Sequence, residues 1–210
     1  MDTIPPNITA PVSLPLPELR SRVAVLSGNH TETSALLVNL AFRHCQQQGN
    51  VLCIDASRHQ LTEVQFRLLL RQRAIYQRLS ESPTIPPQMA RTALNVVSQG
   101  LAQRHTPPPL LLLDSVRETP DWERTVQFLL NAGATIVEVL PTPNALVFGR
   151  YNTVILLRAT HEQADTVSRA VGRKVSGEDI VALKTGQGFL VHLADVYRVI
   201  IPNALVERSG

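Results

Sequence analysis

Short apolar runs alternate with helical segments along most of this 210-residue sequence. The runs at 22–27, 51–56, 110–116, 134–140 and 151–159 are apolar enough to form strands that are buried on both faces. We predict helices at 32–48, 61–79, 86–104, 120–132, 161–172 and 177–183. Because this alternation is typical of βαβ units, it predicts an α/β fold around a mostly parallel sheet.

The last two apolar runs, 189–194 and 197–202, are close enough in sequence to form antiparallel strands. The pattern therefore predicts one three-layer α/β domain over residues 22–203, with a tail at 204–210. Residues 1–21 hold five prolines and are expected to be an extended N-terminal segment, in which PVSLPLPEL can add an edge strand.

Composition excludes several classes of protein. A hydrophobic content of 44% with 18% charged residues is typical of a chain with a sizeable core and excludes a disordered one. No apolar run reaches the roughly 18 residues of a membrane span, and the first residues lack a secretory signal, so we expect a cytoplasmic protein without membrane contact. Cys45 and Cys53 are expected to be reduced, and no spacing indicates a metal site.

The segment RVAVLSGNHTETSALL, beginning at Arg22, has the layout of a phosphate-binding loop between a strand and a helix. Such a loop needs GxxxxGK[ST], whose lysine neutralises phosphate. One register places Ser27 and Glu32 on the two glycines and Thr33 on the lysine, and a register one residue later starts at Gly28. Neither register supplies a lysine, because the first lysine of the chain is Lys174.

Glu32 would also place a negative charge where phosphate should bind. A carboxylate near a helix N-terminus is favourable, so we expect Glu32 to cap the helix and to satisfy the backbone donors that a phosphate would use. Ser34 keeps the hydroxyl of the motif. The sequence therefore predicts a vestigial nucleotide site made of Ser27, Gly28, Asn29, His30, Thr31, Glu32, Thr33, Ser34 and Asp114.

Asp114 ends the run LLLLDSV in the manner of a Walker B strand. It can hold magnesium, or it can be a polar strand end that caps the next turn; the sequence leaves both readings open. The following position, where a catalytic glutamate would polarise water, is Ser115. Since general-base catalysis is typically worth about 10²–10⁴-fold, hydrolysis at a useful rate is not expected.

The order of these segments resembles the motor domain of the FtsK/HerA superfamily of DNA-pumping ATPases. PVSLPLPELRSRVAVLSG resembles the entry into that domain, VLCIDAS its second strand with an acidic end at Asp55, and LLLLDSV through PTPNAL its Walker B strand, helix and sensor strand. YNTVILLRATHEQADTVSRAVG and EDIVALKTGQGFLVHLADVYRVIIP resemble the segments that follow. The resemblance covers about residues 11–202 and implies a RecA-like P-loop NTPase core.

The residues on which activity would depend depart from that family. The lysine, the catalytic acid and the sensor glutamine are absent, with Leu140-Pro141 in the glutamine's place. We therefore interpret the chain as a catalytically silent pseudo-ATPase that acts as a binding, assembly or regulatory subunit with a protein partner or as an oligomer, in contact with DNA or near it. No cofactor is expected; an active enzyme would need ATP and magnesium. One alternative is an active, DNA-associated ATPase with an atypical Walker A loop, which would use Ser34 and Asp114 for magnesium together with Lys174 or an arginine from elsewhere. The other is an interaction module unrelated to DNA.

Arginines supply 18 of the 20 basic residues, and the net charge is only +3. By analogy with ring ATPases, Arg150 or Arg158 can reach a neighbour's phosphate in trans, with surface solvation as the alternative. Arg67, Arg71 and Arg78 share helical spacings and form a stripe that can face either DNA phosphates or water.

Overall fold

The computed structural model describes residues 12–13, 22–57, 63–64, 66, 74–79, 82–101, 107–143, 146, 149–193 and 195–201. Its strands are β1 (Val12–Ser13), β2 (Arg22–Leu26), β3 (Val51–Asp55), β4 (Ala74–Arg78), β5 (Leu110–Asp114), β6 (Thr135–Val139), β7 (Thr153–Leu156), β8 (Gln187–His192) and β9 (Asp195–Ile200). Its helices are α1 (His30–Gln46), α3 (Pro87–Leu101), α4 (Pro120–Asn131), α5 (His161–Ala170) and α6 (Gly177–Val181).

The described strands form one mixed sheet in the order β1-β9-β8-β7-β2-β6-β5-β3-β4. The run from β7 to β4 is parallel throughout, whereas β8 is antiparallel to both β7 and β9. This confirms the predicted α/β fold with its antiparallel C-terminal strands. The short β1 lies parallel to β9 at one edge, within the segment where an extra strand was expected.

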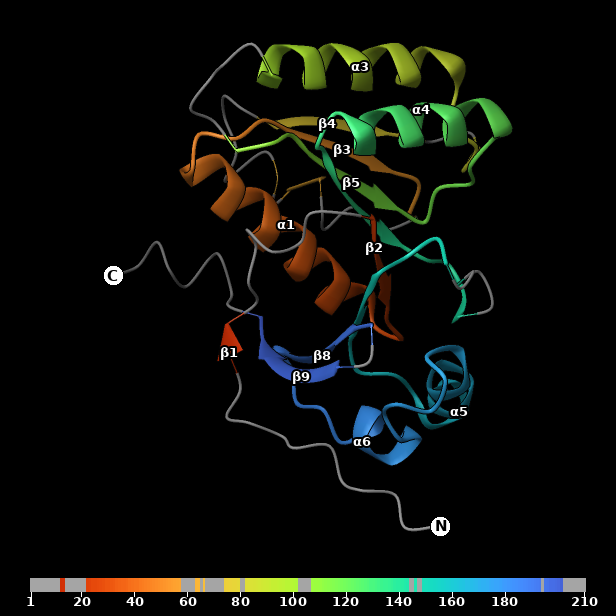
Figure 1. The fold of residues 1–210 in the computed structure, drawn as a ribbon. Coiled ribbons are helices and arrows are strands. Elements are labelled where there is room, and N and C mark those ends of the chain that lie inside the picture. The colour runs from red at the N-terminus through yellow and green to blue at the C-terminus, as the bar shows by residue number, and fades with distance from the viewer. Residues whose placement is uncertain are drawn as a thin grey trace.

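Helices cover both faces of the sheet (Figure 1). On β2, Val23 and Val25 pack with α1, whereas Ala24 and Leu26 belong to the cluster with α5 and α6. On β5, Leu110 and Leu112 join the α1 side, and the alternate positions pack with α3 and α4. Because successive strand residues point to opposite faces, α1 forms one layer and the other four described helices form the layer across the sheet.

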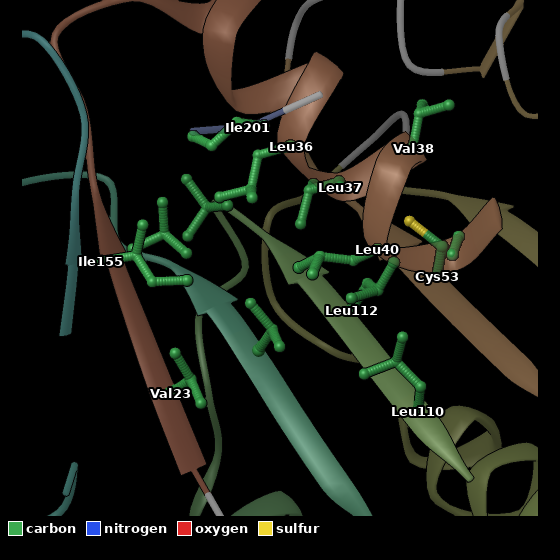
Figure 2. Close-up of a cluster of buried hydrophobic side chains, with 14 of the residues drawn as sticks. Val23, Leu36, Leu37, Val38, Leu40, Cys53, Leu110, Leu112, Ile155 and Ile201 are labelled. Carbon is green, nitrogen blue, oxygen red and sulfur yellow. The ribbon is translucent and has the colours of Figure 1, made fainter. Parts of the chain in front are cut away.

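The core under α1 is almost entirely aliphatic (Figure 2). Leu36, Leu37 and Leu40 of α1 are fully buried against strand residues such as Val23 and Leu112. Burying a side chain of this size contributes roughly 1.5–3 kcal/mol, so this face fixes α1 firmly against β2 and positions the loop between them.

One predicted helix was partly wrong. The segment 61–79 was expected to be helical, but Ala74–Arg78 forms β4, parallel to β3 at the sheet edge. Its side chains alternate in exposure, with Ile75 and Gln77 exposed and Tyr76 partly buried against Phe66. Five residues of period-two alternation inside an arginine- and glutamine-rich run gave too short a signal to separate from a helix.

The other predicted elements are confirmed, with ends that agree or differ by up to three residues. The strand predicted at 151–159 is the shortest of the central strands, Thr153–Leu156, because the chain leaves the sheet before α5. Within the described residues, no helix has the length and apolar character needed to cross a membrane.

Candidate nucleotide loop and the charged cluster beside it

The predicted loop lies at the carboxyl end of β2, which has β6 and β7 as its neighbours. Only three residues, Ser27 to Asn29, connect β2 to α1, which begins at His30. The helix thus starts two residues before the predicted position. A connection this short gives few backbone amides that can wrap around a phosphate group.

The amides of this loop already have acceptors within the chain. The Gly28 N–H donates to the Arg158 carbonyl at 3.1 Å, and the Asn29 N–H donates to Ser27 Oγ at 3.0 Å. The Thr31 N–H donates to Asn29 Oδ1 at 3.0 Å. The loop therefore satisfies in cis several of the donors through which a helix N-terminus binds an anion.

Asn29 is the N-cap of α1, which corrects the expectation that Glu32 would cap this helix. Asn29 has an extended backbone, and its carbonyl also accepts from Thr33 N and Thr33 Oγ1. Glu32 is 6% exposed, and neither of its carboxylate oxygens accepts a hydrogen bond from the described residues. The side-chain amide of Asn29 reaches the first-turn donors directly, whereas the Glu32 side chain is directed elsewhere.

Glu32 instead faces Arg158, whose Nη2 lies 3.3 Å from Glu32 Oε1. Burial raises the pKa of the Glu32 carboxyl, and the Arg158 guanidinium opposes that rise. Arg158 is 41% exposed, so the pair lies at the border between interior and solvent. The one predicted trans arginine next to the loop is thus engaged with a carboxylate of its own chain.

Gly28 is packed tightly against the start of α5. A Cβ atom at this position would lie 2.4 Å from Gln163 Oε1 and 3.0 Å from Ala159 Cα. Beside this contact is a cavity of about 500 Å³, lined by Gly28, Asn29, His30, Thr31, Arg158, Ala159, Thr160 and Val181. Residues of α5 therefore occupy the space directly over the loop glycine.

The two lysines lie after α5 and α6. The Lys174 ammonium donates to the Leu193 carbonyl, next to His192, which pairs with Thr153 at the amino end of β7. Lys174 therefore lies at the amino end of β7, opposite the end of the sheet that carries the loop. Lys184 is exposed and follows α6.

Asp114 ends β5, and β6 separates it from β2. It is 3% exposed and lies directly across from Asp55, its register partner on β3, which is fully buried. Burial and the Asp55 charge raise the pKa of Asp114 to about 7, although a hydrogen bond of 3.0 Å from Ser115 Oγ lowers it. Asp55 accepts from Tyr76 Oη at 2.5 Å. Within the described residues, no group of three or more His, Cys, Asp or Glu side chains is placed to hold a metal.

The predicted DNA-facing stripe is only partly described. Arg67 and Arg71 lie outside the described residues. Arg78 is in β4, with its Nη1 3.5 Å from Glu63 Oε2. Since β4 is a strand, the helical spacing on which the stripe was based does not hold at Arg78.

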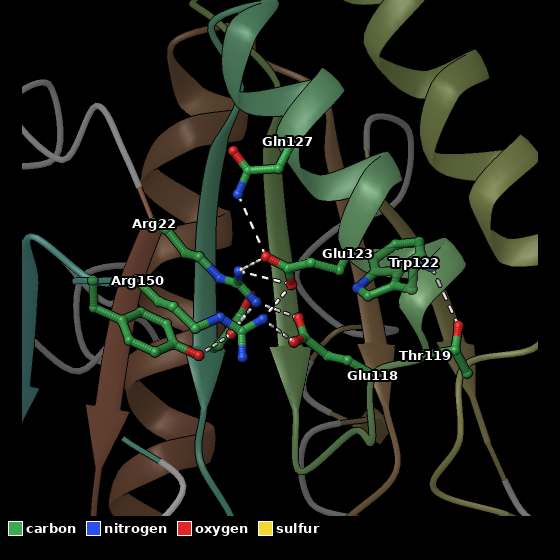
Figure 3. Close-up of polar contacts among 9 residues, drawn as sticks. Arg22, Glu118, Thr119, Trp122, Glu123, Gln127 and Arg150 are labelled. Carbon is green, nitrogen blue, oxygen red and sulfur yellow. Dashed lines mark hydrogen bonds and ion pairs between the residues drawn. The ribbon is translucent and has the colours of Figure 1, made fainter. Parts of the chain in front are cut away.

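Sequence reasoning missed a charged cluster on the α4 side of the sheet, centred on Arg22 (Figure 3). Arg22 is 2% exposed. Its Nε donates to Glu138 Oε1 at 2.8 Å, and its Nη1 donates to Glu123 Oε1 at 2.9 Å. Its Nη2 donates to Glu118 Oε1 and to Glu138 Oε2. We call Arg22, Glu118, Glu123, Glu138, Arg150 and Tyr151 the Arg22 cluster.

Arg150 and Tyr151 complete this cluster. Arg150 Nη2 donates to Glu118 Oε2 at 2.5 Å and to Glu123 Oε2, and Tyr151 Oη donates to Glu138 Oε2. Arg150 is thus bound to carboxylates of its own chain, across the sheet face from α1. A sequence signal existed, because Glu138 interrupts the otherwise apolar run ATIVEVL, and a buried charge in a strand needs a partner.

A search of solved structures finds the same fold in several proteins of very low sequence identity. The DNA-packaging ATPase B204 of Sulfolobus turreted icosahedral virus superposes with a TM-score of 0.61 at 9% identity, over 86% of this chain and 97% of that one. VirB4 of Thermoanaerobacter pseudethanolicus has a TM-score of 0.59 at 8% identity, over 98% and 99%. The bacterial conjugative coupling protein TrwBΔN70 has a TM-score of 0.57 at 9% identity, over 92% and 89%.

Compared with protein-family models and with curated proteins, the sequence gives no match. The chain therefore has a RecA-like α/β fold that it shares with these three structures, and at 8–9% identity the similarity shows the fold alone. The fold-level part of the resemblance drawn from the sequence is confirmed.

Proposed function

We propose that this protein is a catalytically silent relative of the DNA-translocating ATPases and acts as a binding or assembly subunit near DNA. The loop between β2 and α1 carries this proposal. The amides of Gly28, Asn29 and Thr31 are bonded within the chain, the loop glycine is packed under Gln163, and Glu32 brings a buried carboxylate to the first turn. Bound triphosphate would have to displace these contacts and would meet a carboxylate.

The supply of positive charge at the loop also favours this proposal. A working loop places a lysine against the β- and γ-phosphates. Here Thr33 or Ser34 takes that position, depending on the register. Lys174 lies at the opposite end of the sheet, near the amino end of β7. Arg158 is the nearby guanidinium, and its charge is offset by Glu32. Net attraction for a triphosphate is therefore weak.

The second half of the catalytic apparatus is altered as well. Ser115 stands where a general base would follow Asp114, and its hydroxyl donates to the Asp114 carboxylate. A serine in that role cannot take a proton from water. The buried Asp114–Asp55 pair supports the reading of Asp114 as a polar strand end, since its pKa of about 7 leaves it partly protonated near neutral pH.

Calorimetry with ATP and magnesium tests the proposal that the protein is catalytically silent. We expect no saturable heat up to millimolar nucleotide for the wild-type protein. A micromolar Kd would contradict the proposal and support the rival, an active ATPase with an atypical loop. In that rival, exposed Lys184, which follows the α6 residue Val181 in the wall of the loop cavity, is a candidate cation. Lys184→Met should then abolish binding, with Lys174→Met as the matched control.

The association with DNA is tested separately. The structural neighbours include a DNA-packaging ATPase and a conjugative coupling protein, which is why DNA is the first partner to test. Binding to a short duplex should weaken steeply with salt, as counterion release from phosphate contacts requires. Absence of binding at 50 mM salt would favour an interaction module unrelated to DNA.

A further inference from the structure

A second cavity, of about 510 Å³, lies between the Arg22 cluster and the carboxyl ends of β5 and β6. Its apolar wall is formed by Pro83, Val116, Val139, Leu140 and Pro141. Its polar residues are Ser115, Arg117, Glu118, Glu138, Arg150 and Tyr151. It shares no lining residue with the loop cavity. The volume lies within the range of small-molecule sites, and the lining combines an apolar wall with fixed polar groups.

The carboxylates in this wall have little capacity left for a ligand. Both oxygens of Glu118 and both oxygens of Glu138 already accept hydrogen bonds from arginine or tyrosine. Tyr151 spends its hydroxyl proton on Glu138. The carboxylates therefore position the arginines, and their oxygens are already occupied as hydrogen-bond acceptors.

The arginines, in contrast, retain free donors. Among the described residues, Arg150 Nη2 donates to Glu118 and Glu123, and none accepts from Arg150 Nη1. Figure 3 shows the other terminal nitrogen of Arg150 pointing away from Glu118 and Glu123. The Arg117 side chain is exposed and has no side-chain partner among the described residues. Two guanidinium groups that line this cavity thus have N–H donors to which no described residue is bonded.

We propose that this cavity binds a single carboxylate group carried on a short, branched apolar body. Three guanidiniums and three carboxylates balance in and beside the cavity, so no surplus positive charge compensates the second charge of a phosphate dianion, whereas the donors of Arg117 and Arg150 suit a singly charged carboxylate. The carboxylate accepts from Arg150 Nη1 and Arg117, and the apolar body packs on Val116, Val139 and Leu140. The carboxylate comes either from a free acid or from the C-terminus of a partner chain.

This site goes beyond the proposed function, because it does not depend on whether the loop binds nucleotide. The test is an NMR titration of the full chain with 3-methylbutanoate, matched by neutral 3-methylbutanamide. We expect saturable shifts at Ser115, Val116 and Leu140 with a Kd on the order of 1 mM, as suits so small a ligand. The amide should bind at least about tenfold more weakly, since it lacks the charge.

A second arm distinguishes the sources, using an acetylated tripeptide that ends in leucine with a free carboxyl group, against its C-terminal amide. Binding of the free acid alone assigns a small molecule, and binding of the peptide as well assigns a partner's C-terminus. Equal binding of acid and amide, or no saturable shifts with either carboxylate, would overturn the proposal.

Variants place the ligand in the cavity. Arg150→Met should weaken binding at least about tenfold, whereas Arg169→Met, which removes an exposed arginine on α5, should not change it. Because Arg150 also supports the Arg22 cluster, Val116→Trp gives an independent check by filling the cavity without altering charge. Unchanged binding in a folded Val116→Trp protein would contradict the assignment.

Discussion

The two ends of β2 handle polar groups in opposite ways. At the carboxyl end, the loop of Ser27 to Asn29 meets its needs mostly through neighbours in sequence: Ser27 and Asn29 bond each other, and Asn29 bonds the first turn of α1. At the amino end, Arg22 bonds Glu118, Glu123 and Glu138, which are 96 to 116 residues away. The charged groups beside the loop are the partly exposed pair of Glu32 and Arg158, whereas the Arg22 cluster brings several buried charges together.

The hydrogen bonds of the loop and the ion pairs of the Arg22 cluster should therefore differ in how much they contribute to stability. The local hydrogen bonds fix the backbone conformation of the loop, and each contributes only roughly 1 kcal/mol to the free energy of unfolding. A buried charge whose partners are removed is far more costly, about 3–5 kcal/mol. We therefore expect substitutions in the Arg22 cluster to change stability and substitutions at the loop to change it only modestly.

The largest effect should come from Arg22→Met. Removing this guanidinium leaves Glu138, which is 4% exposed, without its main counter-charge, and the free energy of unfolding should fall by about 3–5 kcal/mol. Urea denaturation measures the loss. The matched control is Arg124→Met on α4, whose pair with Asp121 is about four-fifths exposed and should contribute less than about 0.5 kcal/mol. Equal losses in the two variants would break the comparison.

The next effect concerns pH and Asp114. Its folded-state pKa of about 7 lies above the ordinary 3.8, so the folded protein binds this proton more tightly than the unfolded chain. Stability from this group is therefore present at low pH and is lost as pH rises from about 4 to 7, by as much as about 3 kcal/mol. Asp114→Asn should flatten that part of the pH profile. If the free energy of unfolding of the wild-type protein were equally flat between pH 4.5 and 7.5, the pKa of Asp114 would not be raised in the folded state, and the prediction would be wrong.

Gly28→Ala should have a smaller effect. The new methyl group would meet Gln163 Oε1 at 2.4 Å and Ala159 Cα at 3.0 Å, and overpacking of this kind costs about 1–3 kcal/mol. The double variant Gly28→Ala, Gln163→Ala should recover part of the loss, since the Gln163 side chain is the nearer neighbour. A double variant no more stable than additivity predicts would mean that Gln163 does not press on the loop.

The smallest effect distinguishes the true cap from the expected one. Asn29→Ala should lower the free energy of unfolding by about 1 kcal/mol, because the Thr31 amide loses its acceptor. Glu32→Gln should leave stability unchanged or raise it near neutral pH, because the buried carboxylate accepts no hydrogen bond from the described residues. The opposite ranking in thermal denaturation would restore Glu32 as the cap.

The sequence predicted the features that depend on local pattern. Apolar runs such as 110–116 located the central strands, and the absence of lysine before Lys174 holds in any fold. The mostly parallel sheet was predicted from the alternation of strands and helices, and its antiparallel C-terminal strands from their closeness in sequence. These succeeded because hydrophobic periodicity and loop length act over a few residues.

The sequence could not supply features that depend on long-range contacts. Strand β4 forms by pairing with β3, and the Tyr76 hydroxyl is positioned by its hydrogen bond to Asp55. Arg22 and Glu138 are 116 residues apart, and only the pairing of β2 with β6 brings their side chains together. Glu32 was assigned the cap from its place in the first turn, although Asn29, three residues earlier, has the backbone conformation that capping requires.

The most direct test of the silent loop is a crystal of the protein soaked with a non-hydrolysable ATP analogue and magnesium at high concentration. The account predicts an unchanged loop, with the Gly28 amide still on the Arg158 carbonyl and Gln163 still packed over Gly28. Phosphate density cradled between Ser27 and Ala35, with Glu32 and Gln163 displaced, would contradict it.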